Sequence, residues 1–148
     1  MASRDMLSSP ALQAQVGWRG LGMQTYSAAA VSAPLALNAS NSNSLVRFDS
    51  TVGGVNVTVT LPAVAAAAGC RWRVVKATAG GNVWTFAAPA GTLIAAAIAN
   101  NAVATGAAAT SLAFNAAASA GSWADISCDG VVYQITAVGS AAGSFTIA

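Results

Sequence analysis

The residues in this chain that could carry out chemistry are few, and their spacing matches no catalytic arrangement. The 148 residues contain no histidine and no glutamate, so the commonest general bases and metal ligands are missing. Of the four aspartates, Asp129 is explained by a turn and Asp5 lies in a segment without periodicity. Asp49 and Asp125 fall on two different predicted strands, and they would serve as a carboxylate pair for glycoside cleavage only if the fold brought them together. We therefore expect that the protein is not an enzyme.

Three other motifs that can bind ligands or support catalysis are incomplete in this chain. Residues 125–130 are similar to a calcium-binding loop, but they lack its alternating ligands and its distal glutamate. Lys76 is the single lysine, and no serine stands out as its partner in a Ser–Lys dyad. Gly17, Gly20 and Gly22 neither follow a predicted strand nor open a helix, as a phosphate-binding loop would require. We expect no metal, no cofactor and no catalytic residue.

Cys70 and Cys128 both fall on the predicted inner faces of strands. Two cysteines do not make a disulfide framework. A free cysteine on an inner face behaves as a small buried hydrophobe, and thiols stay reduced in a protein that is assembled in the cytosol. We favour two buried thiols, and a disulfide is the alternative.

The composition points to a surface that lies against other protein. Ionisable residues make up 7% of the chain and apolar residues 55%. Soluble domains usually carry about 25% charged residues, so this chain lacks the charged coat that keeps ordinary monomers apart. The net charge of +2 is too small and too scattered for a nucleic-acid partner or an anionic membrane.

No segment of the sequence is suited to crossing a membrane or to directing export. A membrane-spanning helix needs about 18 or more consecutive apolar residues, and glycine, proline and asparagine interrupt the most apolar region. Asp5 and the Ser-Ser-Pro of residues 8–10 stand where a secretory signal would have an unbroken apolar run. We expect no membrane partner.

Basic and aromatic residues alternate at Arg71, Trp72 and Arg73, a pattern that also occurs in nucleic-acid grooves. On a strand, however, Trp72 faces away from both arginines, which favours a core tryptophan between two outward arginines. Outward arginines can meet the carboxylates or carbonyls of a neighbouring subunit. Trp18 and Trp123 have no evident place in the core, so each is either an interface anchor or an aromatic covered by a loop of its own subunit. The candidate interface residues are Trp18, Arg19, Arg71, Arg73 and Trp123.

From residue 45 onward, apolar and polar residues alternate with the two-residue period of strands. Val55, Val57, Val59 and Leu61 share one face, and Pro62 ends that strand. Residues 63–68 are either one helical turn or a tight connection, and residues 95–109 are either a short helix or a long loop. The predicted strands are residues 45–49, 55–61, 70–76, 82–86, 92–94, 110–114, 122–128, 131–138 and 144–147.

The sharpest local signal is Asp129-Gly130, a preferred two-residue type I′ hairpin turn. Folding the chain at this turn would pair Cys128 with Val131, Ile126 with Tyr133, and Ala124 with Ile135. The polar residues on either side then share the opposite face. A slip of one residue would scramble this separation, so the turn and the register agree.

These features predict an all-β protein, an antiparallel β-sandwich or jelly roll of about eight or nine short strands. Residues 1–44 show no sustained period and are expected to be an extended N-terminal arm and loop. Residues 45–148 are expected to form the sandwich domain.

Several strings between residues 55 and 138 resemble β-rich structural proteins of tailed bacteriophages. They are Thr58-Val-Thr-Leu-Pro62, Arg73-Val-Val-Lys76, Asn82-Val-Trp-Thr-Phe86, Pro89-Ala-Gly-Thr-Leu-Ile94 and the closing Gly121-Ser-Trp, Cys128-Asp-Gly130 and Tyr133. The stretch covers a little over half of the chain and carries no chemical signature. A small β-domain with an N-terminal arm is most similar to capsid decoration (cement) proteins, and it is less similar to tail-fibre tip domains.

The resemblance implies a jelly-roll fold and a virion protein of the capsid exterior, assembled in the host cytoplasm. Its implied partners are the major capsid protein and copies of itself, as a dimer or trimer. Its implied role is to bind the outer surface of the shell and to cement neighbouring major capsid subunits. The alternative is the receptor-binding tip module of a tail fibre or spike.

Overall fold

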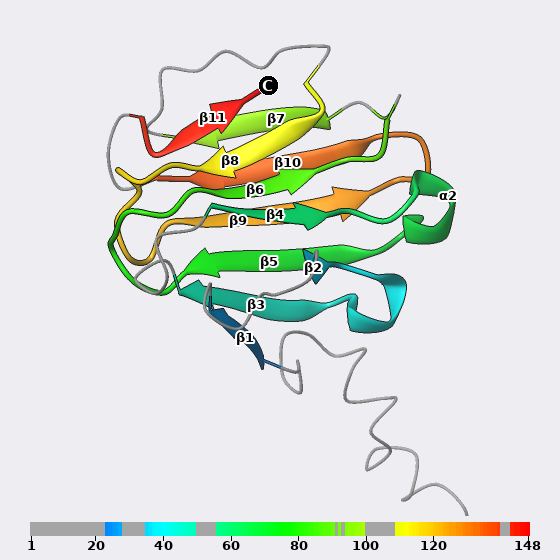
Figure 1. Ribbon diagram of the computed structural model, residues 1–148. Helices are drawn as coiled ribbons and strands as arrows, with labels where there is room; N and C mark the ends of the chain where they lie inside the picture. Colours follow the sequence, from blue (N-terminus) through cyan, green and yellow to red (C-terminus); the bar gives the residue numbers. More distant parts are fainter. Residues whose placement is uncertain are drawn as a thin grey trace, which may run out of the picture.

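The structure, a computed structural model, describes residues 23–27, 35–49, 56–90, 92, 94–99, 109–139 and 143–148. Over these residues the chain forms two β-sheets that pack face to face (Figure 1). The predictions of an all-β fold and of a two-sheet sandwich are confirmed.

Six strands form the first sheet, called sheet A, and five form the second, called sheet B. In spatial order, sheet A contains β1 (Met23–Ser27), β3 (Ser44–Asp49), β5 (Arg71–Lys76), β9 (Trp123–Cys128), β10 (Tyr133–Val138) and β7 (Ile94–Ala99). Sheet B contains β11 (Phe145–Ile147), β8 (Ser111–Phe114), β6 (Trp84–Ala87), β4 (Val57–Thr60) and β2 (Leu35–Ala36).

Both sheets are mixed, so the prediction of an antiparallel sandwich is wrong. The strands from β1 to β9 alternate between sheet A and sheet B, and the chain therefore winds around the core. This winding places β1, β3 and β5 parallel to one another in sheet A, and β2, β4 and β6 parallel in sheet B. Antiparallel pairs occur mainly where the later strands join, as in β5–β9 and β9–β10. The jelly-roll topology, which is built from antiparallel pairs, is not confirmed.

The sandwich also begins earlier in the chain than residue 45 and contains more strands than expected. Strands β1 and β2 lie within the segment assigned to the arm and loop, and they pair with β3 and β4. Leu37, in the same segment, is buried in the core. Strand β7 extends through part of residues 95–109, which were expected to be a helix or a loop. The predicted arm up to residue 22 lies outside the described residues.

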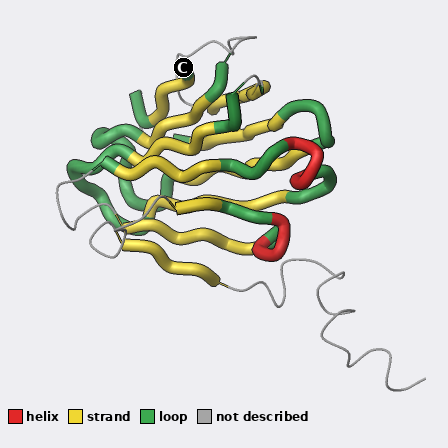
Figure 2. Tube along the Cα trace, turned by 45° about the vertical axis from the view of Figure 1, so that its right-hand side comes forward, coloured by secondary structure: helices red, strands yellow, loops and turns green. Residues whose placement is uncertain are grey.

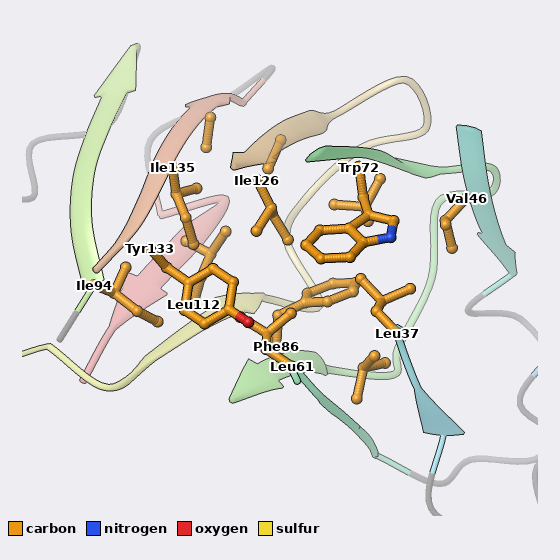
Figure 3. Packing of buried hydrophobic residues seen from close by; sticks show 14 of the residues in the cluster. Leu37, Val46, Leu61, Trp72, Phe86, Ile94, Leu112, Ile126, Tyr133 and Ile135 are labelled. Carbon is orange, nitrogen blue, oxygen red and sulfur yellow. The ribbon is translucent and has the colours of Figure 1, made fainter. Parts of the chain in front are cut away.

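Alternation along the strands builds the core between the sheets (Figure 3). Trp72 and Val74 from β5, and Trp84 and Phe86 from β6, are all fully buried, as alternation along each strand requires. Phe48 of β3 lies at the centre of an aromatic cluster. Its ring centroid is 4.8 Å from that of Trp84, and 4.9 Å from that of Phe114. These contacts join sheet A to sheet B through tightly packed aromatic rings.

The hairpin between β9 and β10 is confirmed, but the two-residue turn predicted for it is wrong, because residues 129–132 connect the strands. The register accordingly differs by two residues from the prediction. Cys128 pairs with Tyr133, and Ile126 pairs with Ile135. A shift of two residues returns every side chain to the same face, so the pattern of apolar residues cannot distinguish the two registers.

The loop chemistry explains which register forms. The Asp129 carboxylate accepts hydrogen bonds from the backbone N–H groups of Val131 and Val132, both at 2.8 Å. These bonds close a loop of residues 129–132, in which Gly130 has a φ of 96°. Val131, expected on the apolar face, is therefore carried to the loop tip, where it is 75% exposed.

Two short helical turns lie at one end of the sandwich (Figure 2). The α-helix α2 (Val64–Ala67) follows β4 after Pro62, so the helical turn is the one of the two alternatives for residues 63–68 that forms. The 3₁₀ turn η3 (Ala39–Asn41) is closed by reciprocal hydrogen bonds between Asn38 and Asn41. The Asn41 side chain also accepts a hydrogen bond from the indole of Trp72, at 2.8 Å.

The position of Phe48 leads to a stability prediction. Phe48→Ala removes the ring by which sheet A packs against the aromatic residues of sheet B, and we expect it to lower the free energy of unfolding by roughly 3–5 kcal/mol. Denaturant unfolding measures this loss. Thr136→Ala, at an exposed position of β10, is the control and should change stability by about 0.5 kcal/mol or less. Equal effects of the two substitutions would contradict the central position of Phe48.

Candidate protein interface

Three of the five candidate interface residues lie on the outer face of sheet A. Arg71 and Arg73 point outward from β5, and Trp123 points outward from the adjacent strand β9. Trp72, between the two arginines, is fully buried, which confirms the core position expected for it. Trp18 and Arg19 lie outside the described residues.

Arg73 is held by residues of its own chain. It lies directly opposite Asp125 in the β5–β9 pair, and its Nε and Nη2 atoms donate to the two carboxylate oxygens at 2.6 and 2.5 Å. The guanidinium carbon also lies 4.6 Å from the ring centroid of Trp123. The hydrogen bonds from Arg73 to Asp125 are the main cause that raises the pKa of Arg73, and the negative charge of Asp125 raises it further. Partial burial of the guanidinium acts in the opposite direction.

This cluster is partly exposed and electrically balanced. The side chains of Arg73 and Asp125 are 36% and 27% exposed. The carboxylate predicted for Arg73 in a neighbouring subunit is thus provided within the same chain. Sequence reasoning missed Asp125 as this partner, because β5 and β9 are distant in the sequence and only their pairing aligns the two residues.

The other carboxylates have separate partners. Asp49, at the end of β3, accepts a hydrogen bond from Thr78 at 2.6 Å. Strand β5 lies between β3 and β9, so Asp49 and Asp125 do not form the carboxylate pair considered for glycoside cleavage. The backbone N–H groups of Val132 and Val131 lower the pKa of Asp129. Within the described ranges, no three metal-binding side chains cluster together.

Lys76 is fully buried at the end of β5, opposite to the end that carries α2. Its Nζ donates hydrogen bonds to the backbone carbonyls of Asn115 and Gly80, at 2.9 and 3.2 Å, with Ala116 at 3.5 Å. All three acceptors are backbone carbonyl oxygens and none is a serine hydroxyl, so these contacts form no Ser–Lys dyad. Burial of the ammonium lowers the pKa of Lys76. The two-residue period that buries Trp72 and Val74 also places Lys76 inward.

Charge is distributed unequally between the outer faces of the two sheets. All charged residues of the described strands belong to sheet A, and those that point outward are Arg47, Asp49, Arg71, Arg73 and Asp125. The strands of sheet B contain no charged residue at all. Its outer face therefore consists of small, uncharged side chains.

The small side chains of sheet B form rows that cross the sheet. Thr58 of β4 lies opposite Thr85 of β6, Thr85 lies opposite Ala113 of β8, and Ala113 lies opposite Thr146 of β11. A second row of the same kind contains Ala36, Thr60, Ala87 and Ser111. We call these two rows the uncharged face. Period-two alternation predicted the polar face of β4, but it carries no information on which strands align.

The helical turns of the described residues, α2 and η3, are too short to cross a membrane. No protein-family model matches the sequence, and no curated protein matches it either.

The lowered pKa of Lys76 predicts how stability changes in alkaline solution. Between that pKa and the ordinary value of 10.5, the unfolded chain keeps a proton that the folded chain releases, so the folded state gains stability as the pH rises. Lys76→Met keeps the length of the side chain but cannot titrate. We expect the unfolding free energy of the native chain, relative to Lys76→Met, to increase between about pH 7 and about pH 10 in denaturant titrations.

The comparison with Lys76→Met removes the contributions of groups that both chains share. Tyr133 is one such group, since burial raises the pKa of its phenol. A difference that stays constant over this pH range, or that moves in the opposite direction, would contradict the buried position of the ammonium.

Proposed function

We propose that this chain is a structural virion protein that binds the outer surface of a phage capsid and cements neighbouring major capsid subunits. The observation that carries this proposal is the uncharged face of sheet B, in a chain whose few strand charges all lie on sheet A. The partners are the major capsid protein and further copies of this chain.

The uncharged face suits a protein partner because charged residues are depleted at the centre of protein interfaces. Its side chains are short, so a flat partner surface can approach the sheet closely. The methyl groups of threonine are apolar, and each Å² of apolar surface that a partner buries stabilises the complex by about 25 cal/mol. Threonine hydroxyls can both donate and accept hydrogen bonds. Repetition of this contact over a shell would add many such contributions, and few charges would make the binding insensitive to salt.

The outer face of sheet A carries charged side chains, so it is suited to remain exposed to water when sheet B is bound to the shell. Arg73 is already paired with Asp125, so it needs no carboxylate from a partner. On this proposal Arg71, Arg73 and Trp123 lie on the side away from the shell. A role for Trp18 and Arg19 in an N-terminal arm stays a prediction.

A receptor-binding tip module is the second candidate, and Trp123 is the observation that favours it. This tryptophan is partly exposed on a face with several polar side chains, an arrangement that suits stacking of a sugar ring. One face of its ring, however, is covered by the Arg73 guanidinium. The location of the protein on the particle separates the two candidates, since a cement protein is spread over the shell and a tip module lies on the tail.

A charge placed on either sheet tests which face binds. Thr58→Lys introduces an ammonium at an exposed position of the uncharged face, and Thr136→Lys introduces the same group at an exposed position on the outer face of sheet A. Burying an unpaired ammonium is costly, so we expect Thr58→Lys to weaken binding about tenfold or more. Thr136→Lys should bind like the native chain. Cosedimentation with purified capsids that lack this protein measures both affinities.

Two results would contradict the proposal. The first is that the native chain does not bind capsids, and the second is that Thr136→Lys weakens binding as much as Thr58→Lys does. The thermal stability of the capsids adds a functional measurement, since capsids decorated with the native chain should withstand a higher temperature than bare capsids.

A further inference from the structure

Cys70 and Cys128 face each other just beyond the last residue pair of β5 and β9, at the end of the sandwich that carries α2. The register of β5 and β9 pairs Arg71 with Ser127, and one further step along the two antiparallel strands pairs the cysteines. The backbone N–H of Cys128 donates to the carbonyl of Cys70 at 3.0 Å, and the carbonyl of Cys128 accepts from the backbone N–H of Gly69 at 2.8 Å, so Gly69 and Cys70 together face Cys128 just before β5 begins. Both thiols are free.

The two side chains point to the same side of sheet A, into the core. Cys70 is 9% exposed and Cys128 is 4% exposed. The Cys128 sulfur lies 3.6 Å from the carbonyl oxygen of Val64, the first residue of α2. Both cysteines also add to the rise in the pKa of Tyr133, whose main cause is burial.

We propose that Cys70 and Cys128 are a dithiol site that forms a cross-strand disulfide when the folded chain meets a low-molecular-weight disulfide, such as oxidised glutathione. Directly opposite residues of antiparallel strands have Cα atoms about 4.5–5.5 Å apart. This spacing lies within the range of about 4.4–6.8 Å that disulfides span. The spacing of the two strands is therefore compatible with the bond.

The reaction is an exchange of two thiols for one disulfide. The thiolate of Cys70 attacks one sulfur of oxidised glutathione, whose S–S bond breaks and releases one glutathione thiolate. The thiolate of Cys128 then attacks the Cys70 sulfur of the mixed disulfide and releases the second glutathione thiolate. The chain loses two electrons, oxidised glutathione gains two, and the two thiol protons pass to the two glutathione thiolates.

The structure indicates which cysteine reacts first. Cys70 is the more exposed of the two, and it follows the exposed Gly69. The covering helix α2 has four residues and no side-chain cap at its start, so local opening at this end requires little structure to unfold. Attack at Cys70, followed by closure onto Cys128, fits this arrangement.

The disulfide would close a long covalent loop through the sandwich. It would link the start of β5 to the end of β9, and β6, β7 and β8 all lie between these points in the chain. A cross-link over a loop of this length removes conformational freedom from the unfolded chain. We expect the oxidised protein to unfold at a temperature higher by roughly 10 °C.

The test is to incubate the folded native chain with oxidised glutathione and to analyse it by mass spectrometry and by thiol titration after denaturation. We expect a monomer that is lighter by two hydrogen atoms, has no free thiol and unfolds at a higher temperature. Reduction with dithiothreitol should reverse all three changes. Peptide mapping should join the segments that contain Cys70 and Cys128.

Cys70→Ala and Cys128→Ala are matched controls, because each retains one thiol and exchanges a small buried side chain for another. Each should give a glutathione adduct or no reaction, and neither should gain thermal stability. The proposal is overturned if the native chain keeps two thiols, if it forms only adducts or intermolecular dimers, or if the internal bond appears only after denaturant has unfolded the protein.

Discussion

The alternation of side chains along each strand is the constraint on which the rest of this structure depends. Because successive residues point to opposite faces, every strand divides its side chains between the core and one outer face. Strand β5 shows the consequence, since Trp72, Val74 and Lys76 point inward while Arg71 and Arg73 point outward. In a chain with so few charges, this division leaves one outer face charged and the other without a single charge in its strands.

The same constraint explains the positions of two of the buried polar groups. The period places Lys76 and Tyr133 inside, and each is then satisfied by a backbone carbonyl beyond the end of a strand. Lys76 binds the carbonyls of the loops that follow β5 and β8, and the Tyr133 hydroxyl donates to Pro62 at 2.5 Å. The loop after β8 of sheet B is thus bonded to β5 of sheet A, and Pro62 after β4 of sheet B is bonded to β10 of sheet A. The two contacts lie at opposite ends of the sandwich (Figure 1).

Much of the fold could be predicted from the sequence, because the two-residue period is a local property. It identified the strands from β3 to β6 and from β8 to β11, as well as the inner faces of β5, β9 and β10. It could not reveal strand direction, because parallel and antiparallel strands share the same period, and so the winding of the chain between the sheets was missed. Strand β1 has no clear alternation, and β2 is only two residues long, so neither gave a signal.

The candidate interface was only partly accessible to sequence reasoning, because a surface depends on which strands are neighbours. The outward direction of Arg71 and Arg73 followed from the period, but the pairing of Arg73 with Asp125 did not. The rows that contain Thr58 and Thr85 depend on the β4–β6 register, and the opposed cysteines depend on that of β5 and β9. Each of these features joins residues that are distant in the sequence.

If this chain cements capsid subunits, other protein covers the uncharged face of sheet B. Electron cryomicroscopy of the intact particle, at a resolution that traces the strands of this chain, tests it most directly. We expect β4 and β6 to lie against the major capsid protein, with Arg47 and Arg71 facing the solvent. Density for this chain on the tail alone, or on the shell with sheet A inward, would contradict it.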